Sequence, residues 1–401
     1  MSAVNTNRRR LPKIVVYVAL TVILAALGFV IATRASALSI PTNDYVQYWA
    51  AGRLNLLGLN PYDPAQMLAL ERSVGWPLDY PVMPYYPPWV LAIFMPMGLP
   101  PYPSSRVLWL VFSLGLLLFC AAWLWRFYRG SRKGDILALA AVGTFAPAIL
   151  VLAEGQVTPL VLLGITGFLW FEGRQRWLLA GAFVALTAIK PQLLILFWLA
   201  LFVWVLDRGR WAVLLGAVLA GMAALVAAVI ANPGVVGDYF YYLGHYHSPA
   251  TSDTATPATI LRLLFGADKL WLTLVPPLLG VIWFFFYYWR KHRVTWTWGE
   301  QMPVLLLACV LSAPYAWMHD DVLLLVVVLQ AAVWLAYYHR IRATAIAIAS
   351  YLVLNAVALG LLPRLHYDQA WYVWLPLALL LGYLVVRRTV ARTGSEGFSG
   401  V

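Results

Sequence analysis

Long apolar runs separated by short polar segments recur along the whole chain, and their lengths predict membrane-spanning helices. A helix needs about 20 apolar residues to cross the hydrocarbon core of a bilayer. Twelve runs come near this length, at residues 14–33, 107–125, 136–153, 157–171, 177–189, 193–206, 211–231, 270–289, 303–317, 322–338, 343–362 and 371–386. The pattern therefore predicts an all-α polytopic membrane protein with about 12 transmembrane helices, forming a single integral membrane domain over residues 1–401.

Two places in this pattern allow another interpretation. The short runs 177–189 and 193–206 can be two half-depth helices that meet at Lys190-Pro191. The run 14–33 follows a basic leader, as the apolar part of a signal peptide does. Because no small-residue cleavage site follows a short apolar stretch, a retained first span is the expected outcome.

Composition and charge agree with the membrane class and add an orientation. The chain is 63% hydrophobic and 11% charged, with a mean hydropathy of +0.78, whereas soluble domains average about a quarter charged residues. With the N-terminus inside, 20 of the 28 basic residues and five of the 16 acidic residues fall on the inner side. The positive-inside rule thus predicts cytoplasmic N- and C-termini. The net charge of +12 is a topology signal, so no nucleic-acid partner is expected.

This orientation leaves two long outer segments, 34–106 and 232–269. In the first, a helix is predicted to begin near Asp44 and to lie along the membrane surface as an amphipathic helix. Its two stripes are Asp44, Gln47, Ala51 and Asn55 on one side, and Tyr45, Trp49 and Leu56 on the other. The apolar piece 89–97 is too short to span, which indicates an interfacial or re-entrant helix. The active face is therefore expected outside the plasma (inner) membrane, toward the periplasm or cell exterior.

Polar residues at membrane depth are costly and are by default candidates for function. The candidates are Glu154, Gln156, Lys190, Gln192, His319 and Asp320. Each also has a structural interpretation. Asp44 suits a helix N-terminus, and Lys190 can be a lysine that reaches the interface. Glu154 and Gln156 can satisfy backbone groups at a helix break, and His319 with Asp320 can be a surface turn.

Together these residues suit sugar transfer from a lipid phosphate. Asp44 would accept the proton of the attacking hydroxyl as a general base. Lys190, with His319 or Arg262, would neutralise the leaving phosphate. Attack opposite that phosphate inverts the sugar carbon, and no carboxylate nucleophile is needed.

Several motifs in order also resemble glycosyltransferase family 87, the polyprenyl-phosphate-mannose-dependent α-mannosyltransferases of the GT-C superfamily. They are Asp44 with Asn60-Pro61-Tyr62 and Tyr86-Pro87-Pro88, then Gly155-Gln156, Lys190-Pro191-Gln192, Asn232-Pro233-Gly234, and Ser312-Ala313-Pro314 with His319-Asp320. The resemblance implies a GT-C fold, a catalytic aspartate at Asp44 and a polyprenyl-phosphate-linked sugar donor. Gln47, Tyr62 and Tyr86 are expected to be supporting polar residues.

One departure from the superfamily concerns metal binding. Many GT-C enzymes carry paired acidic residues in the first outer loop, whereas Asn43 precedes a single Asp44 here. No cofactor is therefore expected, although Asp44, His319 and Asp320 offer possible ligands for a divalent metal. Asp63 and Asp79 are possible replacements for Asp44 as the base.

The resulting hypothesis is a membrane glycosyltransferase that moves a sugar, mannose by resemblance, to a glycolipid or glycan acceptor at the outer face of the lipid bilayer. A GT-C transferase for a pentose or an aminosugar fits the same residues. A lipid or sugar transporter is the alternative from another class. It would be expected to show duplicated halves with matched broken helices, and the sequence shows no convincing repeat.

Overall fold

The structure is a computed structural model of the chain, and it describes residues 44–245, 254–337, 341–361 and 369–394. Within these ranges every regular element is a helix. The α-helices are α2 (Tyr45–Leu56), α3 (Pro64–Ser73), α4 (Pro88–Gly98), α5 (Tyr102–Phe127), α6 (Asp135–Thr144), α7 (Ala146–Glu154), α8 (Thr158–Glu172), α9 (Trp177–Thr187), α10 (Ile195–Arg208), α11 (Trp211–Ala231), α12 (Val235–His245), α13 (Pro257–Phe265), α14 (Val275–Tyr287), α15 (Trp298–Ser312), α16 (Leu325–Tyr337), α17 (Ile341–Leu361) and α18 (Trp374–Gly394). Short 3₁₀ segments are η1 (Arg132–Gly134), η2 (Pro191–Leu194), η4 (Leu270–Leu274), η6 (Met318–Leu324) and η7 (Gln369–Val373), and η5 (Tyr288–His292) is a π-helical turn.

Seven helices of the described part are long and apolar enough to cross a bilayer, or eight if the bent pair α6–α7 counts as one span. Four further apolar helices, α4, α8, α9 and α15, are shorter, with 11 to 15 residues. The structure thus confirms an all-α polytopic membrane protein over the described residues. The predicted span 14–33 lies outside those residues, and the total of 12 spans stays a prediction.

The run 136–153, predicted as one span, is two helices. α6 and α7 meet at Phe145 with a bend of 63°, and Phe145 has an extended backbone (φ −85°, ψ 112°). Pro147 follows in the first turn of α7, where its missing N–H needs no helical partner. The freed N–H of Ala146 donates to the Asn355 side chain of α17 at 2.8 Å. A side chain from a distant helix therefore stabilises this break.

The helix predicted near Asp44 is present as α2, but it has no exposed polar face. Gln47 and Asn55 of the predicted polar stripe are buried, as are Tyr45 and Trp49 of the apolar stripe. α4 packs along α2 and α11 lies against it, and Asn55 Nδ2 donates to the Ala228 carbonyl of α11 at 3.2 Å. The prediction of an amphipathic surface helix is wrong in this respect, because neighbouring helices cover both stripes.

The run at Lys190-Pro191 is broken as the sequence indicates. α9 ends at Thr187, and Lys190 has a non-helical backbone (φ −129°, ψ 68°) before η2 and α10 begin. α9 packs closely on α11 through two glycines. A Cβ on Gly181 would lie 1.9 Å from the Val213 carbonyl oxygen, and a Cβ on Gly216 would lie 2.1 Å from that of Leu178.

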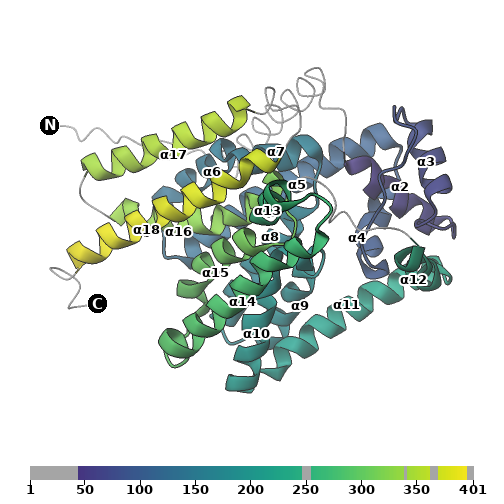
Figure 1. Cartoon of the computed structure of the whole chain (residues 1–401). Helices are drawn as coiled ribbons and strands as arrows, with labels where there is room; N and C mark the ends of the chain where they lie inside the picture. Colours follow the sequence, from purple (N-terminus) through teal and green to yellow (C-terminus); the bar gives the residue numbers. More distant parts are fainter. Residues whose placement is uncertain (1–43, 246–253, 338–340, 362–368, 395–401) are drawn as a thin grey trace, which may run out of the picture.

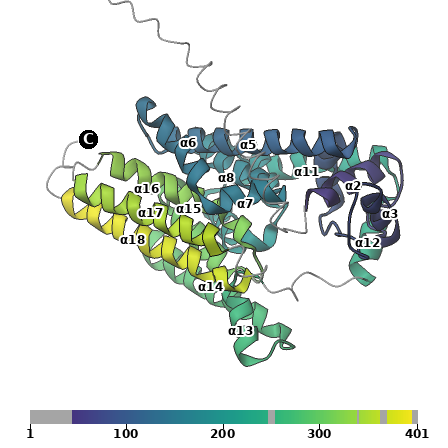
Figure 2. The same cartoon turned by 90° about the horizontal axis from the view of Figure 1, so that it is seen from above.

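Helices from both outer segments gather at one end of the molecule, α2 and α3 from the first and α12 from the second. In Figures 1 and 2, α2, α3 and α12 lie together at this end, and α16, α17 and α18 lie at the opposite end. α7 and α8 occupy the middle in both views. The turn between α7 and α8 is therefore placed to meet residues from both ends of the chain.

Candidate functional site

Polar side chains from four distant parts of the chain meet at this turn. The Gln156 amide, between α7 and α8, donates through Nε2 to Asp44 Oδ2 at the start of α2. Its carbonyl oxygen accepts a hydrogen bond from Lys190 Nζ at 3.1 Å. Lys190 Nζ also pairs with Asp320 Oδ1 of η6 at 2.7 Å. We call Asp44, Gln156, Lys190 and Asp320 the central cluster.

Each member of the central cluster sits where a helix begins, ends or breaks. Gly155, with φ +71°, ends α7 in the left-handed conformation and turns the chain toward Gln156. Pro191 cannot donate a backbone hydrogen bond, and it opens η2 directly after Lys190. Asp320 accepts the Trp317 backbone N–H at 3.1 Å and so holds the start of η6. Irregular backbone of this kind is tolerated at membrane depth where protein covers it.

Asp44 precedes the first helical residue of α2 without capping it. Its side chain makes no hydrogen bond to the α2 backbone, and its carboxylate is directed to Gln156 instead. Burial raises the pKa of the Asp44 carboxyl to about 6, and the nearby Glu154 carboxylate adds to this rise. His319, Lys190 and the Gln156 hydrogen bond act in the opposite direction. A carboxyl with such a pKa is ionised at neutral pH and can still take up a proton.

Lys190 points into the protein and is covered by it, unlike a lysine that extends along the surface toward the membrane interface. Its side chain is 5% exposed and that of its partner Asp320 is fully buried. Thr158 Oγ1 donates to the same Asp320 oxygen at 2.8 Å. Because a buried charge is stable only when paired and hydrogen-bonded, the position of the ammonium group is closely fixed.

His319 lies beside the central cluster, in contact with a second carboxylate. Its Nδ1 pairs with Glu154 Oε2, and its Nε2 lies 3.6 Å from Asp320 Oδ1. The Trp317 ring stacks on the imidazole with centroids 6.0 Å apart. His319 is 3% exposed, so it is not part of a surface turn.

Tyrosine side chains form one wall of the site. Tyr48 donates to the Gln156 carbonyl oxygen at 3.1 Å, and its hydroxyl lies 3.2 Å from that of Tyr86. Tyr62 donates to the Tyr86 backbone carbonyl at 2.8 Å. The structure thus brings the predicted Tyr86 to the site and adds Tyr48, whereas Tyr62 contacts the backbone of Tyr86 and packs on Tyr242. The spacing of Tyr48, four residues after Asp44 on the same helix, was a usable signal.

Three predicted residues do not join the cluster. Gln47 is buried and Gln192 is partly buried, and neither makes a hydrogen bond to the cluster. Arg262 lies in α13, where it donates to the Ala267 carbonyl at 3.1 Å. Figure 2 shows α13 projecting from the body, away from α7 and α8. A role for Arg262 in binding the donor phosphate, and for Gln47 and Gln192 as supporting polar residues, stays a prediction.

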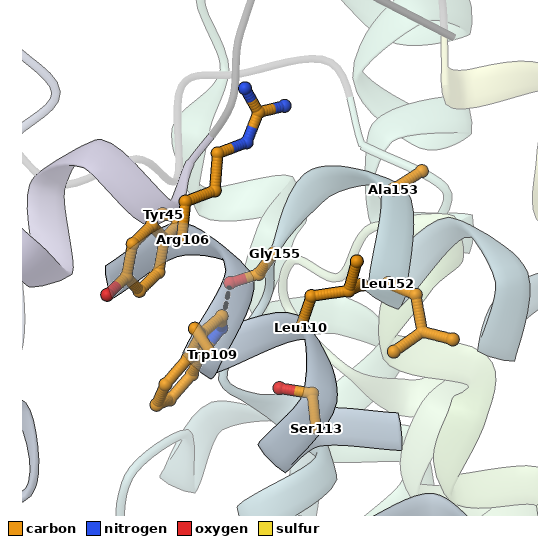
Figure 3. Close-up of a pocket in the computed structure, with 8 residues that line it drawn as sticks. All are labelled: Tyr45, Arg106, Trp109, Leu110, Ser113, Leu152, Ala153 and Gly155. Atoms are coloured by element: carbon orange, nitrogen blue, oxygen red, sulfur yellow. Dashed lines mark hydrogen bonds between the residues drawn. The ribbon is translucent and has the colours of Figure 1, made fainter. Parts of the chain in front are cut away.

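Two further features border the turn. One is a cavity of about 20 Å³, the size of one water, which is lined by Gly155 of the turn and by Tyr45 and Trp109. Trp109 Nε1 donates a hydrogen bond to the Gly155 carbonyl at 2.7 Å (Figure 3). The other is Arg106, which lines this cavity with its guanidinium directed away from Gly155 (Figure 3).

Among the described residues, no three His, Cys, Asp or Glu side chains come together as a group that could hold a metal ion.

Comparison with known families identifies the class of enzyme. The sequence model of glycosyltransferase family 87 matches residues 85–314, more than half of the chain, and the chain belongs to this family. The protein is therefore a membrane glycosyltransferase. No curated protein and no solved structure matches the chain significantly. The family match includes Gln156 and Lys190 but neither Asp44 nor Asp320.

Proposed function

We propose that the enzyme transfers mannose from a polyprenyl-phosphate donor to an acceptor hydroxyl at the outer face of the membrane, with inversion and with Asp44 as general base. One observation carries this proposal. A partly buried carboxylate and a buried ammonium group, 146 residues apart in sequence, are joined through the single amide of Gln156. Sugar transfer from a phosphate needs these two groups, one to accept a proton and one to stabilise the departing anion.

The proposed reaction is a single displacement at the anomeric carbon. The acceptor oxygen forms a bond to this carbon while the bond from the carbon to the phosphate oxygen breaks. The electron pair of the broken bond leaves with the polyprenyl phosphate, and the hydroxyl proton passes to Asp44. General-base catalysis of this kind typically contributes about 10²–10⁴-fold to the rate.

Positive charge for the leaving phosphate comes from Lys190, and the imidazole of His319 lies beside it. Lys190 has three N–H donors, of which two are used by Asp320 and Gln156. The third is available for a phosphate oxygen. Asn43 precedes the single Asp44 where many GT-C enzymes have an acidic pair, and side chains of the protein face the phosphate. We therefore propose that no divalent metal takes part.

The surroundings of α16 support a lipid donor. An apolar cleft of about 720 Å³ lies between α6, α16, α17 and α18. α16 begins directly after η6, which carries His319 and Asp320. With about 2.0 Å of rise per residue in the 3₁₀ segment η6 and about 1.5 Å in α16, Val327 in the cleft lies about 12 Å along the helix axis from Asp320. An anionic head at Lys190 and an apolar tail along α16 therefore fit one molecule.

The sugar is the least constrained part of this proposal, and a donor series tests it. Purified enzyme in liposomes would receive radiolabelled polyprenyl-phosphate mannose, a polyprenyl-phosphate pentose and a polyprenyl-phosphate aminosugar, one at a time. We expect transfer from the mannose donor alone. Transfer from another donor instead would replace mannose and keep the chemistry, whereas transfer from a nucleotide sugar would contradict the lipid-phosphate donor.

A further inference from the structure

The orientation of the Gln156 side chain is fixed by its neighbours. Its Oε1 accepts hydrogen bonds from Lys190 Nζ and from the Tyr48 hydroxyl, both at 3.1 Å. An ammonium group has only donors and a carboxylate only acceptors. Turning the amide around would place its NH₂ group against Lys190 and its carbonyl against Asp44. Both contacts would be repulsive, so only one orientation satisfies the site.

This orientation makes the two oxygens of Asp44 unequal. Oδ2 accepts the Gln156 N–H, whereas Oδ1 accepts no hydrogen bond among the described residues. A hydrogen bond to a carboxylate stabilises its charged form at the bonded oxygen. A proton arriving at Asp44 is therefore directed to Oδ1.

We propose that Gln156 is a positioning residue that couples the ammonium group of Lys190 to Asp44 and makes Oδ1 the atom that takes the acceptor's proton. This inference rests on the proposed role of Asp44 as general base. The ammonium group polarises the amide through its carbonyl oxygen, which makes the N–H at the other end a stronger donor. Lys190 thereby helps to keep Asp44 ionised through Gln156, without touching it, in addition to its proposed contact with the phosphate.

Other groups also act on Asp44, and the test must separate them from Gln156. Glu154 at the end of α7 raises its pKa, and His319 of η6 and Lys190 lower it. Among the described residues, Tyr48 of α2, Asp320 of η6 and Tyr86 are further titratable side chains near Asp44. All of these side chains remain when Gln156 alone is substituted, and only Lys190 and Tyr48 lose a direct hydrogen bond, the one each donates to Gln156 Oε1.

The experiment is the pH dependence of kcat/KM for Gln156→Met and Gln156→Glu. In the wild type, activity requires ionised Asp44, so kcat/KM should fall as the pH drops below about 6. Methionine removes the N–H donor, so the pH below which kcat/KM falls (the acid limb of the profile) should rise by about one unit. At low pH this is about a tenfold loss of kcat/KM. Most of this loss should disappear at pH 9. Glutamate keeps the contact to Lys190 but faces Asp44 with a second carboxylate, so its acid limb should move further still.

Gln330→Met is the matched control. Gln330 is another buried glutamine whose amide has two hydrogen-bond partners, Gly299 and Tyr383, at a site in α16. We expect a similar change in thermal stability and no shift of the acid limb. If Gln156 were only structural, Gln156→Met would lose activity by the same factor at every pH, and this result would overturn the inference.

Asp44→Asn separates this inference from the proposed function. If Asp44→Asn is inactive and the acid limb of Gln156→Met is unshifted, the coupling through Gln156 is wrong and the base assignment remains. If folded Asp44→Asn turns over like the wild type, the base assignment fails, and the inference fails with it.

Discussion

At the scale of single residues, Lys190 shows how charge is managed in this site. Its ammonium group is buried and pairs with a fully buried aspartate. A buried pair of this kind adds little stability by itself, but removal of one partner leaves an unpaired charge and costs about 3–5 kcal/mol. The same side chain thus pairs with Asp320 of η6 and, in the proposed mechanism, provides positive charge for the phosphate.

Lys190→Ala is expected to weaken use of the donor and to lower stability. The KM for the donor should rise, because one cation facing the phosphate is lost, whereas the KM for the acceptor should change little. Kinetics with each substrate varied in turn, together with thermal unfolding in detergent, would measure both effects. Lys190→Ala/Asp320→Asn should recover part of the stability, because no charged carboxylate is left unpaired, and none of the donor use. A folded Lys190→Ala enzyme with normal donor dependence would remove Lys190 from the phosphate site.

The sequence was sufficient to select most residues of the site but not their contacts. Gln156, Lys190 and His319 stood out because polar residues are rare at membrane depth, and Asp44 stood out as a carboxylate at the predicted start of a helix in the first outer segment. Thr158 gave no such signal, since a threonine at the start of an apolar helix is ordinary. The pairing of Lys190 with Asp320 across 130 residues depends on how three helix ends meet, which one sequence does not reveal.

At the scale of elements, breaks in apolar helices build the site. The break at Lys190 was predictable, because a proline follows a charged residue inside an apolar run. The bend at Phe145 was missed, because the partner that stabilises it, Asn355, comes from another helix. The burial of α2 was missed for a related reason. A stripe pattern shows which residues share a face, and it does not show whether water, lipid or protein covers that face.

Gly216→Ala tests how closely α9 and α11 must pack to hold Lys190. A methyl group at Gly216 would lie 2.1 Å from the Leu178 carbonyl oxygen, so α11 must move away from α9. Overpacking typically costs about 1–3 kcal/mol, and we expect a lower Tm with reduced transfer activity. Gly221→Ala in the same helix is the control, because no atom lies within 4 Å of the added methyl group. Equal Tm values for the two variants would contradict this packing.

At the scale of the whole molecule, lipid must cover much of the surface. Only 17% of the apolar window of α11 and 11% of that of α17 is buried by protein. The membrane class was predictable from composition and run length alone. The number of crossings was not, because several apolar helices are too short to be assigned as spans by length.

Two exposed serines test the orientation of the molecule. Ser73 lies in the first outer segment and Ser131 follows α5, so one crossing by the 26-residue helix α5 separates them. The two native cysteines, Cys120 and Cys309, are buried and should give little background. In intact cells, an impermeant maleimide should label Ser73→Cys and should label Ser131→Cys only after permeabilisation. The reverse labelling would place the site on the cytoplasmic side.

The most direct test of the whole account is sugar transfer by Asp44→Asn, measured beside Asp63→Asn with the donor that the wild type uses. Asn keeps the size of Asp44 and removes its ability to take a proton. Asp63 is the next acidic residue along the chain and the alternative base that the sequence offers. Its side chain instead caps α3 by accepting the Ala65 backbone N–H at 2.8 Å. The account predicts that folded Asp44→Asn loses transfer by about 10²-fold or more, while Asp63→Asn remains active. Wild-type turnover by Asp44→Asn, or loss of transfer in folded Asp63→Asn alone, would contradict it.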